Sequence, residues 1–117
     1  MAGLSIPTRG EVYWANLDPT FGTEIAKTRP AVIISNDIGN EHSPRVTIAA
    51  ITSRGVERVF TFEVLVRAGE GGLIQTSKVL LNQIRSIDKR RLGRRIGRLS
   101  DQRMHEVDEA LRFSLVL

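Results

Sequence analysis

Short apolar runs separated by polar turns dominate this sequence, a pattern typical of β-strands rather than helices. Residues 10–17 combine aromatic and β-favouring residues, which predicts a strand. Residues 31–35 form an apolar run without polar alternation, which predicts a central strand. In residues 60–66 every second position is apolar, so we expect a half-buried strand there. Further strands are predicted over residues 46–52, 79–84 and 95–99.

A helical period occurs at the end of the chain, where Ser100 is a suitable N-cap. The apolar positions of this helix are Met104, Val107, Leu111 and Leu115. A loop and two turns are predicted over residues 18–28, 36–44 and 69–72. Strands separated by turns, with one terminal helix, predict a mainly β fold of the α+β class. We expect a small, strongly bent sheet or barrel capped by the C-terminal helix.

Composition places the chain among folded globular proteins. Its 117 residues point to a single domain spanning residues 1–117, and 41% hydrophobic with 26% charged residues argues against disorder. There is no cysteine, which excludes disulfides and thiolate metal sites. The N-terminus lacks the apolar stretch of a signal peptide, and no apolar run approaches the length of a membrane span. We therefore expect a cytoplasmic protein.

Positive charge is concentrated in one segment. The formal net charge is +4, but residues 85–103 hold eight basic residues against two acidic ones. Such a segment is either a solvated face or a surface for phosphate groups or an acidic protein. Charge by itself does not separate these two readings.

Arg29 and Thr52 are the strongest candidates for chemistry. Arg29 stands at the entry of one predicted strand and Thr52 at the exit of another. If these strands are antiparallel neighbours, the two side chains meet at one edge of the sheet, where a guanidinium beside a hydroxyl suits a phosphodiester. The alternative for Arg29 is a structural ion pair with a carboxylate such as Glu24. The alternative for Thr52 is an ordinary strand-end threonine.

Other familiar catalytic devices have little support. No glycine-rich stretch has the pattern of a nucleotide-binding loop. The two histidines, His42 and His105, are far apart in sequence and differ in context, so a histidine-based ribonuclease or a metal site is not expected. We therefore predict neither a metal nor a cofactor.

Six segments match, in order and in spacing, those of a known family. They are residues 9–19 (RGEVYWANLDP), 22–24 (GTE), 29–37 (RPAVIISND), 49–53 (AAITS), 79–89 (VLLNQIRSIDK) and 107–111 (VDEAL). Over nearly its whole length the chain therefore resembles the MazF/PemK family of toxin–antitoxin endoribonucleases.

This resemblance implies a small SH3-like barrel of the PemK/CcdB type that works as a homodimer. It implies metal-independent, sequence-specific cleavage of single-stranded mRNA by internal 2′-hydroxyl attack, which gives 2′,3′-cyclic phosphate and 5′-hydroxyl ends. A cognate antitoxin with an acidic, disordered tail would occupy the RNA groove. Arg29 and Thr52 match the catalytic pair by position, and the RNA supplies its own nucleophile, so the protein needs to supply orientation and charge stabilisation.

The loop over residues 21–27 is expected to flank the RNA. Phe21 either stacks on an unpaired base or folds back into the core. Glu24 either takes the proton of the 2′-hydroxyl, reads a base or holds Arg29. The remaining candidates for contact with bases or phosphates are Thr23, Lys27, Ser77, Asn82 and Gln83.

Two other functions compete with the nuclease. One is a same-fold toxin that acts on a topoisomerase without cleaving RNA, and the other is a non-catalytic nucleic-acid-binding barrel that uses residues 85–103. Arg29 with Thr52 argues against the first, because a topoisomerase poison does not need a phosphate-cleaving pair. The second predicts binding without cleavage and a steep dependence on salt.

Overall fold

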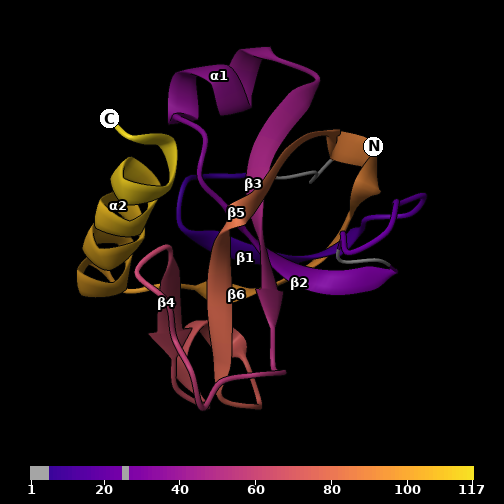
Figure 1. Cartoon of the computed structure of the whole chain (residues 1–117). Helices are drawn as coiled ribbons and strands as arrows, with labels where there is room; N and C mark the ends of the chain where they lie inside the picture. The colour runs from indigo at the N-terminus through magenta and orange to yellow at the C-terminus, as the bar shows by residue number, and fades with distance from the viewer. Residues whose placement is uncertain (1–5, 25–26) are drawn as a thin grey trace.

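Six strands form one antiparallel sheet in the order β4-β5-β3-β2-β1-β6 in the computed structural model, which describes residues 6–24 and 27–117. The strands are β1 (Glu11–Asn16), β2 (Thr28–Ile33), β3 (Arg45–Thr52), β4 (Glu63–Val66), β5 (Ser77–Asp88) and β6 (Leu92–Arg98). The helices are α1 (Asp37–His42), α2 (Asp101–Leu115) and the short 3-10 turns η1 (Glu70–Gly72) and η2 (Lys89–Arg91). Figure 1 shows α2 lying beside β4 and β5. The predicted α+β fold with a C-terminal helix is confirmed.

A bulge in β5 bends the sheet into a barrel-like shape. Ala49 pairs with Ile84, but the next residue of β3, Ala50, pairs with Leu80. Residues 81–83 of β5 are therefore extra, and such an insertion bends a strand and increases its twist. The edges β4 and β6 do not pair with each other, so the sheet stays open.

Both faces of the central strands are buried. One face, together with α2, forms a cluster that includes Val32, Ile51 and Val107, and the other forms a cluster that includes Ile33 and Ile48. Alternate residues of a strand point to opposite faces, so a strand buried on both sides must be apolar throughout. This explains the apolar run of residues 31–35, which was predicted to be central.

The turn η1 brings the two open edges of the sheet together, because it follows β4 and packs on β6. The approach is between backbones: a Cβ atom added at Gly97 would lie 2.5 Å from the carbonyl oxygen of Gly71. A Cβ added at Gly72, where φ is +78°, would lie 2.2 Å from the carbonyl oxygen of Ile96. Glycine is required at these positions because no side chain fits between η1 and β6.

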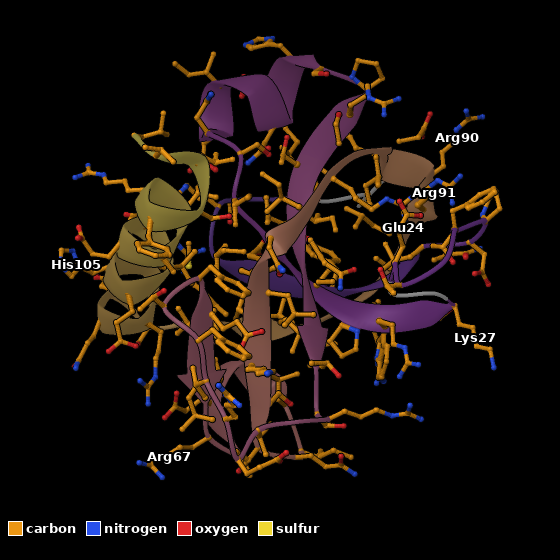
Figure 2. All side chains as sticks on the ribbon, viewed as in Figure 1. Glu24, Lys27, Arg67, Arg90, Arg91 and His105 are labelled. Carbon is orange, nitrogen blue, oxygen red and sulfur yellow. The ribbon has the colours of Figure 1, made fainter. Side chains whose placement is uncertain are left out.

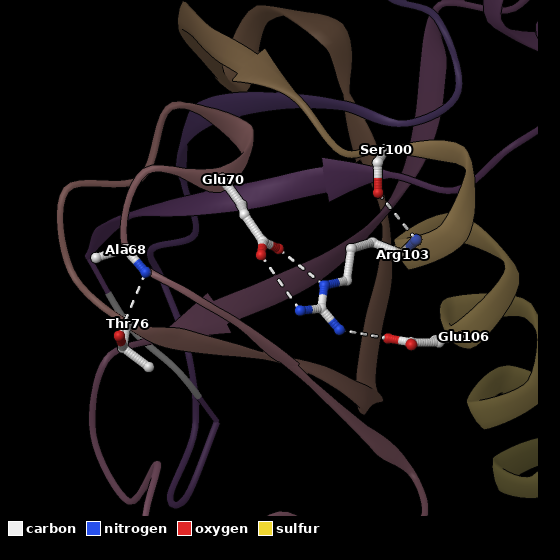
Figure 3. A network of polar contacts seen from close by, with 6 residues as sticks. All are labelled: Ala68, Glu70, Thr76, Ser100, Arg103 and Glu106. Atoms are coloured by element: carbon white, nitrogen blue, oxygen red, sulfur yellow. Dashed lines mark hydrogen bonds and ion pairs between the residues drawn. The ribbon is translucent and has the colours of Figure 1, made fainter.

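An ion-pair network ties η1 to α2 (Figure 3). The Nε of Arg103 donates to Glu70 at 2.8 Å and its Nη1 donates to Glu106 at 2.9 Å, while Ser100 caps the helix by accepting the backbone N–H of Arg103 at 3.1 Å. The hydrogen bond from Arg103 holds the pKa of the Glu70 carboxyl below its ordinary value. The Ser100 cap was predicted from the sequence and is confirmed.

Two predicted elements were wrong. Residues 37–42, predicted as a turn, form α1, because the Asn36 side chain accepts the backbone N–H of Gly39 as an N-cap at 2.8 Å. The strand predicted over residues 60–66 begins only at Glu63, and Phe60 and Phe62 precede it as a stacked pair with ring centroids 5.4 Å apart. A local turn, in which the Glu63 N–H donates to the Phe60 carbonyl, precedes the strand, while the Phe62 carbonyl accepts the Leu81 N–H of β5 at 3.0 Å.

In the part of the chain that the structure describes, no helix has both the length and the apolar character needed to cross a membrane. The helix α2 has 15 residues, and its exposed positions include the charged Asp101, Glu109 and Arg112 as well as the apolar Phe113 and Leu115. Its buried residues are Met104, Val107 and Ala110.

The contact between η1 and β6 predicts a large difference between two glycine-to-alanine changes in β6. Gly97→Ala should lower the free energy of unfolding by about 1–3 kcal/mol, because the Gly71 carbonyl has to move. Gly93→Ala is the matched control, since its Cβ would lie 3.5 Å from Trp14, an ordinary contact. Urea unfolding monitored by circular dichroism measures both. Equal midpoints for the two variants would show that the backbone approach does not constrain the barrel.

Candidate active site

Arg29 and Thr52 come together at one end of the two central strands, as the sequence predicted. The pairing of β2 with β3 runs through Ala31–Ala50, and continuing this register by two residues sets Arg29 opposite Thr52. Because side chains alternate, Arg29 shares the sheet face of Ala31, and Thr52 shares that of Ala50. Both residues are half-buried and line one pocket of about 340 Å³.

Side chains from both faces of the sheet line the pocket, because it lies at the end of the strands. Trp14 and Pro30 are cross-strand partners and lie on the face opposite Arg29. Ser77, a predicted RNA-binding residue, also lines the pocket; it is buried, and its Oγ donates to the Gln75 carbonyl at 2.9 Å. The other lining residues are Thr28, Ile51, Ser53, Gly72, Leu73, Ile74, Gln75, Arg94 and Ile96.

Thr52 is oriented by its own backbone. Its Oγ1 accepts the backbone N–H of Arg54 at 3.1 Å, so the hydroxyl oxygen is fixed while the hydroxyl proton is left to donate elsewhere. Thr52 also pairs across the sheet with Lys78 of β5. The threonine therefore sits on a rigid element rather than in the loop that follows it.

A buried ion pair beside Thr52 holds the segment between β3 and β4. Lys78 and Glu63 have side chains only 9% and 7% exposed, and Nζ of Lys78 lies 2.8 Å from Oε1 of Glu63. The same Nζ donates to the Arg58 carbonyl at 3.0 Å, and Glu63 accepts the backbone N–H of Phe60 at 3.0 Å. The pair was not predicted from the sequence, because a lysine and a glutamate in strands are ordinarily solvent-facing.

The loop between β1 and β2 is fastened at its base. The N–H of Leu17 donates to the Lys27 carbonyl at 2.9 Å, and the N–H of Lys27 donates to the Asp18 carboxylate at 2.9 Å. Arg85 donates to the Leu17 carbonyl at 2.7 Å, and Arg91 donates to the Asp18 carbonyl. This predicted RNA-flanking loop is thus attached to the body of the sheet by two arginines of the basic segment.

Beyond this base, the loop presents exposed side chains. Phe21 is 88% exposed, so the alternative of a core phenylalanine is excluded. Glu24 accepts the backbone N–H of Phe21 at 2.7 Å, and Thr23 is exposed beside it. Glu24, Lys27 and Arg91 lie on one side of the molecule, and His105 lies on the opposite side, on α2 (Figure 2). Ile25 and Ala26, which belong to the same predicted loop, lie outside the described residues.

Two predicted RNA-binding residues lie away from the pocket. Asn82 is exposed and Gln83 is half-buried, and both belong to the bulge of β5. Neither lines the pocket of Arg29 and Thr52, and the neighbouring Leu81 carbonyl accepts the Ser114 hydroxyl of α2 at 3.0 Å. The structure therefore does not bring them to the candidate active site, and a contact with RNA stays a prediction for both.

Most of the basic segment is engaged by the protein itself. Six of its eight residues bind protein groups through their side chains, including Arg95 with Glu11 at 2.6 Å. The other five are Arg85, Arg90, Arg91, Arg98 and Arg103. Arg94 is an exception, and it lines the pocket. Neither Arg94 nor Trp14 was among the predicted site residues, and the structure shows Trp14 to be 37% exposed.

Within residues 6–24 and 27–117, no three side chains of the metal-binding types come together. His42 ends α1 beside Glu41, with its Nε2 at 3.2 Å from the carboxylate, and His105 is exposed on α2. Each histidine is therefore separate from the pocket.

These features define a small α+β protein with an open, barrel-like sheet and a polar site at one end of its central strands. The chain belongs to the family of PemK-like, MazF-like toxins of type II toxin–antitoxin systems, whose sequence model matches residues 8–115. It is 45% identical to endoribonuclease EndoA of Bacillus subtilis (strain 168) over 112 residues, which cover 96% of this chain and 97% of that protein.

Solved structures share the fold. MazF from Deinococcus radiodurans superposes with a TM-score of 0.83 at 27% identity, and the match covers 97% of this chain and 99% of that one. An endoribonuclease in complex with its cognate antitoxin from Mycobacterial species gives a TM-score of 0.80 at 26% identity, covering 95% of this chain and 96% of that one. The family suggested by the sequence segments is thus confirmed.

The buried ion pair beside Thr52 predicts that its two charges must be removed together. Lys78→Met should lower the free energy of unfolding by about 3–5 kcal/mol, because the Glu63 carboxylate then stays buried without its cation. Adding Glu63→Leu should recover a large part of this loss. Arg90→Ala, which breaks an ion pair with Asp88 whose arginine is 90% exposed, is the control and should change stability little. A Lys78→Met protein as stable as the wild type would refute the structural role of the pair.

Proposed function

We propose that this protein is a metal-independent endoribonuclease toxin that cleaves single-stranded RNA with Arg29 and Thr52. The observation that carries the proposal is the placement of these two side chains on one face, at one strand edge, beside one pocket. Membership of the toxin family and 45% identity with a protein named endoribonuclease EndoA support it.

The reaction follows from what the two side chains can donate. The 2′-oxygen of a ribose attacks the adjacent phosphorus, and the bond from phosphorus to the 5′-oxygen breaks. The products are a 2′,3′-cyclic phosphate and a 5′-hydroxyl, which takes up a proton as the 2′-hydroxyl loses one. The protein's task is to hold this geometry and to stabilise the charge that grows on the phosphate oxygens.

Arg29 and Thr52 divide this task. The guanidinium of Arg29 donates charge-assisted hydrogen bonds to non-bridging oxygens. We therefore assign it charge stabilisation ahead of proton donation. Thr52, whose oxygen is fixed by the Arg54 N–H, donates its hydroxyl proton to a second oxygen.

Glu24 is a weaker candidate for the base that accepts the 2′-hydroxyl proton. Its carboxylate lies in the exposed loop, where it accepts the N–H of Phe21, and it does not line the pocket of Arg29 and Thr52. A role in recognition suits it better, together with the exposed loop residues Phe21, Thr23 and Lys27. Phe21 offers a ring on which an unpaired base can stack.

The partners follow from the same site. We propose that the RNA passes between the β1–β2 loop and the pocket, and that Ser77 contacts it there. One of the similar structures is an endoribonuclease bound to its cognate antitoxin. We propose a cognate antitoxin for this chain as well, with an acidic tail that competes with RNA. We also propose that the working unit is a homodimer. The cytoplasm, where mRNA is exposed during translation, is the proposed site of action.

A non-catalytic nucleic-acid-binding barrel is less well supported. That reading needs residues 85–103 to face a polyanion, but six of the eight basic side chains are bound to protein groups. A topoisomerase poison is not favoured either, because such a toxin has no use for an arginine and a threonine that meet at one pocket.

Removing Arg29 should abolish most of the activity. The purified wild-type protein is expected to cut single-stranded RNA in the presence of EDTA, and Arg29→Ala should lower the single-turnover rate at least about 100-fold, because a donor to the developing charge is lost. Electrophoresis of end-labelled RNA measures the rate, and circular dichroism checks the fold.

Three outcomes would contradict this mechanism. Full activity of Arg29→Ala would remove Arg29 from the chemistry, and loss of wild-type activity in EDTA would mean that a metal takes part. Cleavage of a substrate with a 2′-deoxyribose at the cut position would show that the nucleophile is not internal. Sequencing of the 5′-hydroxyl ends would give the recognition sequence.

Thr52→Val should impair the chemical step more than RNA binding. The valine keeps the shape but removes the donated hydrogen bond, so the single-turnover rate at saturating RNA should fall about 100-fold. Thr52→Ser is the control, since it keeps the hydroxyl and should retain most of the rate. A large loss of RNA affinity with an unchanged saturated rate would mean that Thr52 binds the substrate without aiding the reaction.

A further inference from the structure

Arg94 and Trp14 share the pocket with Arg29 and Thr52 but have no part in the proposed chemistry. A bulge places them there. Between two successive cross-strand pairs, β1 contributes one residue, Trp14, and β6 contributes two, Gly93 and Arg94. The flanking pairs are Tyr13–Arg95 and Ala15–Leu92. Bulges turn side chains away from the direction that regular pairing would give them, and they are frequent beside active sites.

The bulge puts Arg94 on the same side of the sheet as the indole. Arg95 pairs with Tyr13 and binds Glu11, so it belongs to the face on which Tyr13 lies. By alternation, Arg94 belongs to the opposite face, which is that of Trp14. Both side chains line the pocket, and Trp14 is 37% exposed, so its ring is partly open to a ligand.

Arg94 differs from its neighbours in having no internal partner. Six other basic residues of the segment bind carboxylates, carbonyls or a hydroxyl, whereas the described structure gives the side chains of Arg94 and Lys89 no hydrogen bond or ion pair, and of these two only Arg94 lines the pocket. Its guanidinium is exposed beside a pocket that also holds Arg29. A fork of donors beside an aromatic ring suits a nucleotide, with the phosphate on the guanidinium and the base on the ring.

We propose that Arg94 and Trp14 form a nucleotide subsite for the residue next to the scissile phosphate. The indole stacks on the base, and Arg94 binds the phosphate that flanks the one held by Arg29. This inference rests on the proposed function, since it assigns the neighbouring position of the same single-stranded substrate. Its role is binding and positioning, and Arg94 takes no part in the chemical step.

The sequence supplies a direct probe, because Trp14 is the only tryptophan. The test uses a mixed-sequence single-stranded RNA whose 2′-hydroxyls are methylated, which blocks the internal nucleophile. Titration of this RNA should quench the tryptophan emission as a base stacks on the indole. Fluorescence anisotropy of a labelled copy of the same RNA measures its affinity independently of the indole.

Arg94→Ala should raise the RNA concentration needed for half-maximal quenching about tenfold, the worth of one charge-assisted hydrogen bond. The slope of log affinity against log salt should become shallower by about 0.7, as expected for one lost phosphate contact on a single strand. Arg94→Lys should recover part of the affinity.

Arg112→Ala is the matched control. It also removes one positive charge, but it lies on α2, its side chain is 67% exposed, and it does not line the pocket. This variant should bind the RNA with the affinity of the wild type, and the RNA should quench its tryptophan emission to the same extent. If Arg94→Ala and Arg112→Ala behave alike, Arg94 does not contact the RNA.

Other results would overturn the subsite in different ways. RNA that binds by anisotropy without changing the emission would leave Trp14 outside the contact, and RNA that does not bind would remove the subsite altogether. Emission that changes on dilution of the protein, but not with RNA, would assign the pocket to a second copy of the chain.

If the wild type cleaves RNA and Arg94→Ala binds normally, the subsite fails and the nuclease stands. If nothing is cleaved but quenching depends on Arg94, the nuclease fails and the subsite stands.

Discussion

The register between β2 and β3 is the constraint on which the site depends. Arg29 and Thr52 can meet because Ala31 pairs with Ala50, and a slip of one residue would move each side chain to the other face of the sheet. Such a slip is costly here, since both faces of these strands are buried and every apolar residue would change its surroundings. The geometry of the pair is therefore fixed by the packing of the core rather than by contacts between the two residues themselves.

A second constraint comes from the charges that surround this core. The basic segment looks from the sequence like a surface for a polyanion, yet Arg85 and Arg91 hold the base of the β1–β2 loop and Arg103 joins η1 to α2. Arginine suits this work because its fork of donors can satisfy backbone carbonyls and carboxylates at once. Of this segment, Arg94 is the residue whose side chain lines the pocket.

The sequence predicts the parts of this fold that follow from periodicity. Continuous apolar runs gave the central strands, and Arg29 and Thr52 could be placed at their ends from position in the runs. Bulges could not be predicted, because an extra residue in one strand changes no pattern in the other. For this reason Arg94 was not recognised, and the position of Asn82 in the β5 bulge was unexpected. The burial of Lys78 depends on Glu63, whose contact with it only the tertiary structure reveals.

The residues proposed for catalysis lie on regular strands, whereas the residues proposed for base recognition lie in a loop and at a bulge. The proposed catalytic pair lies on regular, doubly buried strands, where a change of register would disturb the whole core. The groups proposed to bind bases, Phe21 and Trp14 with Arg94, lie in an exposed loop and beside a bulge of an edge strand. None of these three residues belongs to β2 or β3, the strands that carry the proposed catalytic pair. In such a fold, substitutions in the base-binding residues can alter which RNA sequence is bound while the positions of the proposed catalytic residues are kept.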